Sequence, residues 1–222
     1  MLELLDSRQK LTIICLLSLS ILVCIIGLSF GSFQIELTKI FLGFGDPLQT
    51  EVLLNIRSPR VLLAAFVGAG LGISGAALQG LFRNPLADPA LIGVSAGAAF
   101  GAVSAIVLIN TGLSFLQLGS FLVPLAAIIG SLVVIGLIYI LTASFTNSGI
   151  LYMLLVGIAL NAISTVGIGF LTFISSDSQL RTLTFWMMGS FGSTSWELLL
   201  PAVVLIMVTI FILVSNARKL DI

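Results

Sequence analysis

Histidine is absent from this 222-residue chain, and only 8% of its residues are charged. Without a histidine base, no serine or cysteine can belong to a hydrolytic triad, and the proton relays of many transporters use intramembrane histidine or acidic residues. None of the lysines, Lys10, Lys39 and Lys219, follows the glycine-rich pattern of a phosphate-binding loop. We therefore expect a chain that is not an enzyme, holds no metal or cofactor, and is driven by another protein.

The few charges and cysteines also limit the class of protein to which the chain can belong. A net charge of zero gives no sign of a nucleic-acid partner. Cys15 and Cys24 lie in one apolar stretch, where thiols behave as small hydrophobic groups. Apolar residues make up 59% of the chain and its mean hydropathy is +1.25, whereas about a quarter of a soluble domain is charged. This composition indicates a multi-pass, all-α integral membrane protein that contacts lipid.

Six apolar stretches are long enough to cross a hydrocarbon core, which needs about 20 helical residues. They cover residues 11–30, 61–82, 90–109, 121–141, 150–174 and 198–215. Residues 33–56 combine scattered charges with short amphipathic runs, so we expect them to lie along the outer interface. Residues 175–196 are too short to cross and too apolar for a free loop, which favours a half-helix or re-entrant element.

The distribution of basic residues predicts the orientation in the membrane. Arg8 and Lys10 directly precede the first span, and cytoplasmic loops are enriched in such residues. Because six spans are even in number, both termini of the chain are expected on the cytoplasmic side. This orientation places Arg57 and Arg60 on the external side, although basic residues are usually enriched in cytoplasmic loops. Their external position therefore needs an explanation.

The doublet Arg57-Ser58-Pro59-Arg60 precedes the second span. Serine followed by proline is typical of a helix start, with Ser58 as N-cap and Pro59 as the first helical residue. Arg60 would then lie in the first turn, where the helix dipole disfavours a cation. Two neighbouring cations suit an incoming carboxylate, and anchoring to lipid headgroups is the alternative.

A second polar turn joins the second and third spans. Arg83 stands at the end of one helix, where a cation complements the negative end of the dipole. Asn84-Pro85 disfavours helix continuation. Asp88 is the expected N-cap of the next helix, with Pro89 at its first position.

Small residues recur every four positions in the second and third spans, a spacing that lets helix backbones meet closely or lets helices slide along a path. The positions are Ala64, Gly68, Gly72, Ala76 and Gly80, then Gly93, Gly97, Gly101 and Ala105. We expect Gly68, Gly72, Gly80, Gly93 and Gly97 to serve helix packing or to line a pathway.

These motifs together resemble one transporter family. The run RSPRVLLAAFVGAGLGISGAALQGLFRNPLADPALIGVSAGAA, followed by LLVGIALN and FWMMGSFGSTSW, is similar to the FecCD-type permeases of ABC importers, which carry iron chelates, haem or cobalamin. The resemblance implies an inner-membrane permease subunit that pairs with a second copy or a paralogue. It also implies an external substrate-binding protein and a cytoplasmic ATPase dimer, which binds the ATP. A slight likeness of QGLFRNPLADP to haem-type permeases favours haem or a ferric siderophore as cargo.

The same resemblance assigns roles to residues. Arg57 and Arg60 match an RxPR element that docks acidic residues of the binding protein. Asn84, Pro85, Leu86 and Asp88 match a turn that helps to close the cytoplasmic mouth, and Asn147 and Ser148 lie where the family has a second gate loop. Met187 and Met188 fall in an outer half-helix beside the pathway.

The chain covers about two-thirds of the family's ten-span fold as a single permease domain, residues 1–222, so we expect it to be truncated at the C-terminus. Two alternatives to a permease subunit remain. One is a self-contained channel or secondary carrier, which the uncharged spans disfavour. The other is a non-transporting remnant, which the early end of the chain would allow.

Overall fold

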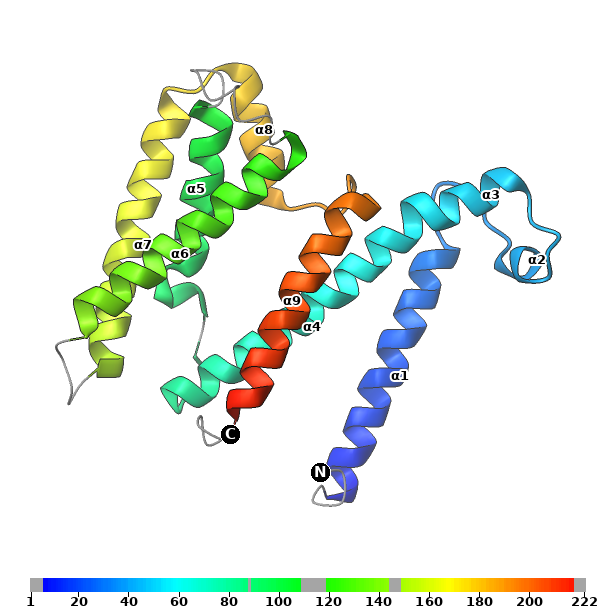
Figure 1. The fold of residues 1–222 in the computed structure, drawn as a ribbon, viewed down its shortest axis with the longest axis horizontal. Coiled ribbons are helices and arrows are strands. Elements are labelled where there is room, and N and C mark those ends of the chain that lie inside the picture. Colours follow the sequence, from blue (N-terminus) through cyan, green and yellow to red (C-terminus); the bar gives the residue numbers. More distant parts are fainter. Residues whose placement is uncertain (1–5, 88, 109–118, 144–148, 218–222) are drawn as a thin grey trace. The chain divides into compact units, whose positions relative to one another are not determined.

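The protein is described by a computed structural model that covers residues 6–87, 89–108, 119–143 and 149–217. Its regular elements in this part of the chain are all helical, which confirms the all-α prediction (Figure 1). In chain order they are α1 Ser7–Ser29, α2 Leu37–Phe41, α3 Pro47–Glu51, the π-helix η2 Val52–Arg57, α4 Ser58–Phe82, the 3-10 helix η3 Pro89–Ile92, α5 Val94–Leu108, the 3-10 helix η6 Gly119–Phe121, α6 Leu122–Thr142, α7 Gly149–Phe173, α8 Asp177–Met188 and α9 Trp196–Asn216.

Five helical segments are long and apolar enough to cross a membrane. They are α1, the continuous helix Pro47–Phe82, the segment Gly119–Thr142, α7 and α9. The third predicted span, 90–109, contains the short η3 and α5. It is not one uninterrupted helix, because the chain bends at Gly93, whose φ of 81° breaks the helix.

The chain forms two compact units. Unit 1 comprises residues 1–71 and 191–211, and unit 2 comprises residues 72–190 and 212–222. The division falls within α4 and within α9.

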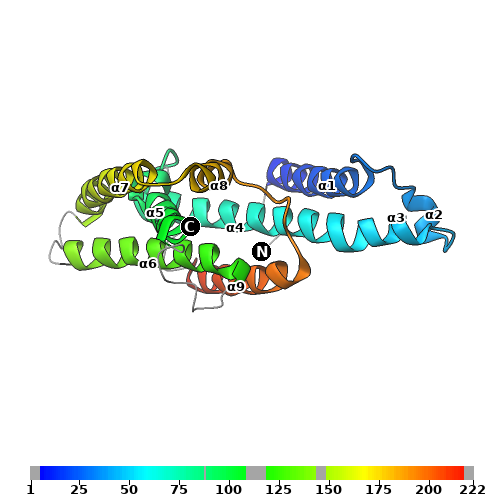
Figure 2. The same ribbon diagram turned by 90° about the horizontal axis from the view of Figure 1, so that it is seen from above.

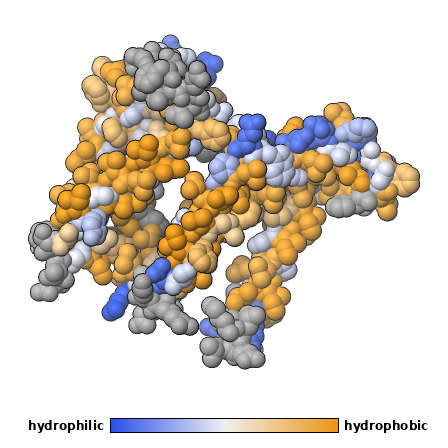
Figure 3. All heavy atoms as spheres, in the orientation of Figure 1, coloured by the Kyte–Doolittle hydropathy of each residue, from blue (hydrophilic) through white to orange (hydrophobic). Residues whose placement is uncertain are grey.

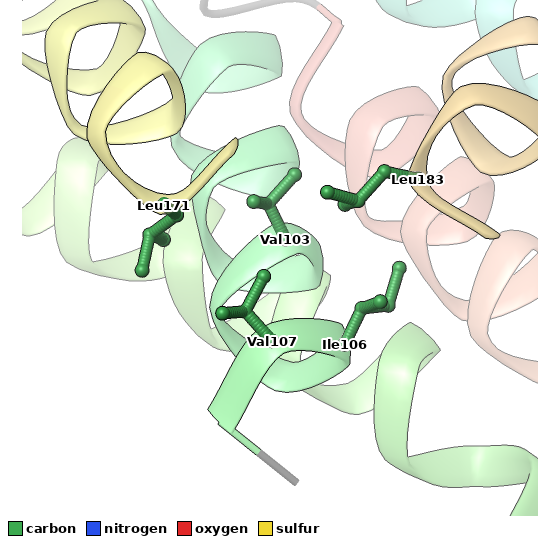
Figure 4. Close-up of a cluster of buried hydrophobic side chains, with 5 residues drawn as sticks. All are labelled: Val103, Ile106, Val107, Leu171 and Leu183. Carbon is green, nitrogen blue, oxygen red and sulfur yellow. The ribbon is translucent and has the colours of Figure 1, made fainter. Parts of the chain in front are cut away.

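The core of unit 2 is built around α5, which lies between α6 and α7 (Figures 1 and 2). One cluster joins α5, α7 and α8 through the buried side chains Val103, Ile106, Val107, Leu171 and Leu183 (Figure 4). A second cluster contains Ile92, Val134 and Ile138. α5 carries no charged residue and contributes six buried residues to unit 2, Gly97, Ala102, Val103, Ala105, Ile106 and Val107.

Glycines bring α5 and α6 into backbone contact. A methyl group at Gly97 would lie 2.8 Å from the carbonyl oxygen of Gly130, and one at Gly101 would overlap the carbonyl of Ala126. Gly130 in turn faces Gly97 and Gly101. Small residues at this spacing let the two helices approach closely. Dispersion contacts and Cα–H···O interactions between the backbones then take the place of contacts between bulky side chains.

The long helices expose apolar side chains along most of their length. None of the residues of α1 is buried, and Leu11, Leu16, Ile21 and Val23 are all more than half exposed. Figure 3 shows α1, α6 and α9 as bands of apolar side chains. Hydrocarbon is a compatible solvent for such surfaces, whereas water is not.

The half-helix predicted within residues 175–196 is confirmed as α8, which has 12 residues. Ser176 caps its first turn in a capping box with Gln179, and Gly189 ends it with a φ of 73°. The side-chain Nε2 of Gln179 also donates to the carbonyl oxygen of Val107 at 3.0 Å. Together with the buried Leu183, this bond fixes α8 to the end of α5.

The predicted helix start at Ser58 is wrong. The helix begins at Pro47, where Asp46 is the N-cap and accepts a hydrogen bond from the amide of Leu48. Ser58 instead donates its hydroxyl to the carbonyl oxygen of Leu53 at 2.7 Å. Asp46-Pro47 and Ser58-Pro59 are equally good local signals for the start of a helix. The helix begins at the first of them and continues past the second through the π-helix η2. Arg60 therefore does not lie at a helix N-terminus.

Candidate functional site

The two arginines of the RSPR doublet have different surroundings, all within unit 1. Arg57, the last residue of η2, is only 7% exposed. Its Nη1 donates to the carbonyl oxygens of Leu28 and Ser29, each at 2.8 Å, and its Nη2 donates to the carbonyl of Phe33. Leu28 and Ser29 are the last residues of α1, where the carbonyls lack intrahelical donors and the dipole favours a cation. Arg57 thus caps the C-terminus of α1.

Arg60 is exposed, in contrast to Arg57. Its Nε donates to the carbonyl oxygen of Phe191 at 3.2 Å and its Nη2 donates to that of Gly192 at 2.8 Å. The guanidinium group carries five N–H donors. These two bonds therefore leave donors available, and its charge faces no carboxylate within ion-pair distance in the described part of the chain, where the ion pair is Lys39–Glu36.

Trp196 is a participant that the sequence did not reveal. In a π-helix the carbonyl of Leu54 should accept from the amide of residue 59, but Pro59 has no amide hydrogen. The indole Nε1 of Trp196 donates to that carbonyl oxygen at 3.0 Å instead. A tryptophan at the start of an apolar span is common at membrane interfaces, and no local pattern connects it to a residue 142 positions away.

The turn after α4 is held by main-chain and side-chain hydrogen bonds. Arg83 has a φ of 49° and donates its amide to Gly80, while the amide of Asn84 donates to Gln79. This pair of bonds is a Schellman motif with arginine in the position that usually holds glycine. The side-chain oxygen of Asn84 accepts from the backbone amide of Leu86 at 2.9 Å, and the carbonyl oxygen of Pro85 accepts from the side-chain Nε2 of Gln79 at 3.1 Å. Leu86 is left 86% exposed at the tip.

The predicted glycine positions fall into two groups. Gly93 and Gly97 make close contacts: a methyl group at Gly93 would lie 2.8 Å from the carbonyl oxygen of Gly157 on α7. Among the described residues, Gly68 and Gly72 of α4 have no neighbour within 4 Å of such a methyl group. Gly80 accepts the hydrogen bond from Arg83.

Met187 and Met188 end α8 and are 56% and 76% exposed. They line a cavity of about 380 Å³ in unit 2 with Thr172, Leu180, Leu183 and Thr184. Asp88, Asn147 and Ser148 lie outside the described residues. Within the described ranges no three histidine, cysteine, aspartate or glutamate residues are placed to hold a metal ion.

The profile of the FecCD transport family matches residues 18–222. The chain belongs to the FecCD transport family. It is 38% identical over 214 residues to the hemin transport system permease protein HmuU of Yersinia pestis, covering 96% of this chain and 63% of that protein. It is 36% identical over 193 residues to the vitamin B12 import system permease protein BtuC of Shigella boydii, covering 86% of this chain and 56% of that protein.

Two further relatives place the family match in context. The molybdate import system permease protein MolB of Haemophilus influenzae is 36% identical over 177 residues, which is 79% of this chain and 50% of MolB. A solved inward-facing structure of a metal-chelate type ABC transporter superposes with a TM-score of 0.80 at 31% identity, covering 96% of this chain and 64% of that one. The chain thus spans about two-thirds or less of the length of these relatives and is a multi-pass membrane protein of their fold.

Proposed function

We propose that this chain forms part of the permease subunit of an ABC importer that takes up an iron chelate, either haem or a ferric siderophore. The family match over residues 18–222 carries the proposal. The uncharged interiors of the spans support a passive conduit, because a self-driven ion-coupled carrier usually needs intramembrane ionisable groups. ATP hydrolysis is assigned to a separate ATPase dimer in the cytoplasm, and this chain binds no cofactor itself.

The relatives differ in their named cargo, and the likeness to the hemin permease supports an iron chelate. That likeness extends over 96% of this chain, against 79% for the molybdate permease and 86% for the vitamin B12 permease. The exposed Met187 and Met188 beside the small cavity of α8 also suit a large apolar ligand, since methionine adapts to irregular surfaces.

The proposed assembly is a pair of permease subunits, either two copies or two paralogues, in the bacterial inner membrane with the termini of this segment in the cytoplasm. An external substrate-binding protein docks through acidic residues at the RxPR element. Arg60 supports this role because its guanidinium is exposed and unpaired by any described carboxylate. The turn at Asn84, Pro85 and Leu86 would close the cytoplasmic mouth, with the projecting Leu86 meeting its counterpart across the dimer axis.

The test is reconstitution of the full-length permease with its ATPase and binding protein in proteoliposomes. We expect ATP-dependent accumulation of haem or a ferric siderophore, and none of molybdate or cyanocobalamin at equal concentration. The control replaces the catalytic glutamate of the ATPase with glutamine, which should abolish uptake. Accumulation of molybdate or cyanocobalamin in place of iron chelates would overturn the substrate assignment, and uptake without ATP would overturn the assignment to ABC importers.

A further inference from the structure

The RSPR doublet takes part in a cluster that joins three segments of unit 1. We call it the α4 clamp and define it as the side chains of Arg57, Arg60 and Trp196 with their carbonyl acceptors. Arg57 binds the end of α1, Trp196 binds the wide turn of η2 from the start of α9, and Arg60 binds the loop that precedes α9. Pro59, at the centre of this cluster, is fully buried.

Arg57 is held in this cluster because its side chain is buried and hydrogen-bonded to carbonyl oxygens. A buried cation is unfavourable unless it is hydrogen-bonded, and here three carbonyl groups compensate it in place of a carboxylate. A partner's carboxylate could reach Arg57 only if those bonds broke and the end of α1 lost its cap. Gly31 shows how tightly the group is held, since a methyl group there would lie 2.7 Å from Nη2 of Arg57.

Arg60 depends on the same wide turn. It lies three residues after Arg57, one turn along the same helix. The loop that it binds, Phe191–Gly192, is also fixed to η2 by Trp196, four residues further along the chain. We therefore infer that two sets of hydrogen bonds orient the exposed guanidinium of Arg60. Arg57 bonds to the end of α1, and Trp196 bonds to the carbonyl oxygen of Leu54 in η2.

We propose that Arg57 and Trp196 are positioning residues, and that they present Arg60 as the arginine that touches the docking partner. This inference rests on the proposed function and divides the roles of the doublet. Arg60 supplies the charge that meets an acidic partner, whereas Arg57 and Trp196 act on docking only through Arg60.

A double-mutant cycle tests the division of roles in the full-length permease in lipid nanodiscs. The probe is the cognate substrate-binding protein, and the measurement is its dissociation constant at low and at physiological salt. Arg60→Gln should weaken binding by up to about fivefold, as for an exposed ion pair, and the loss should shrink as salt is raised. Arg57→Gln should weaken binding to a similar extent, yet add nothing in the Arg60→Gln background.

Two variants perturb the clamp without removing a charge. Gly31→Ala should displace the Arg57 guanidinium, and Trp196→Phe removes the indole donor while keeping an aromatic ring. Each should weaken binding in the native background and have no effect beside Arg60→Gln. The matched control is Gly70→Ala, also in unit 1, where an added methyl group would make an ordinary contact with the side chain of Ile206 at 3.4 Å and should leave binding unchanged.

The outcomes separate this inference from the function on which it rests. If the losses from Arg57→Gln and Arg60→Gln multiply, Arg57 touches the partner directly and the inference is wrong. If Gly31→Ala leaves binding intact, the same conclusion holds even where Arg57→Gln fails to fold. If the unmodified permease does not bind the probe at any salt concentration, the proposed function itself fails.

Discussion

The contact between α5 and α6 offers a sharp test of the fold through two glycines of the same helix. At Gly130 an added methyl group would overlap the carbonyl oxygen of Gly97 and lie 3.1 Å from the Cα of Gly101. Those atoms belong to the backbone, so no side-chain rotation relieves the clash and the helices must separate. At Gly136, a turn and a half further along α6, nothing described lies within 4 Å. Overpacking of this kind destabilises by about 1–3 kcal/mol.

We therefore expect Gly130→Ala to lower the stability of the full-length permease by about 1–3 kcal/mol, whereas Gly136→Ala should be neutral or slightly stabilising, because alanine is the better helix former. Each kcal/mol shifts the unfolding midpoint by roughly 2–4 °C in a domain of 150–250 residues and by less in a longer chain. Thermal unfolding in detergent, followed by the fraction that remains monodisperse, measures the difference. Equal midpoints for the two variants would show that α5 and α6 do not meet backbone to backbone.

Three further predictions concern orientation and the turn after α4. In a cysteine-free background, cysteine at Phe44 should react with an impermeant reagent on intact cells and cysteine at Ser7 should not; the reverse pattern would invert the proposed topology. Arg83→Gly should raise the unfolding midpoint slightly, since glycine adopts a positive φ without strain, and a lowered midpoint would mean that the arginine charge matters more. Cysteine at Leu86 should cross-link in a nucleotide-dependent manner in the proposed pair of permease subunits, and nucleotide-independent cross-linking would contradict the proposed gating role.

The long spans could be predicted from sequence because each is an apolar run that length alone identifies, as α7 and α9 illustrate. The break in the third predicted span could not, since it depends on a distant contact. Gly93 takes a positive φ where the backbone of α7 passes at Gly157, and the side-chain Nδ2 of Asn161 donates to the carbonyl oxygen of Ala90 at 3.2 Å. The local sequence shows Gly93 only as one more member of a series of small residues that is typical of helix packing.

The doublet shows why a motif can be located from sequence before its members can be assigned roles. Arg57 and Arg60 are the same residue type, three positions apart, in a segment that resembles a helix start. Pro59 removes one amide from the helix, and the wide turn of η2 leaves the carbonyl of Leu54 to a donor from α9.

That turn sends the two arginines to different acceptors, one at the end of α1 and one in the loop before α9. The burial that distinguishes them, 7% exposure for Arg57 against an exposed Arg60, arises from segments that are 24 to 132 residues away in sequence. The doublet that we propose for docking therefore also joins helices of unit 1. Replacement of both arginines at once cannot separate the two functions, whereas the cycle of single and double variants can.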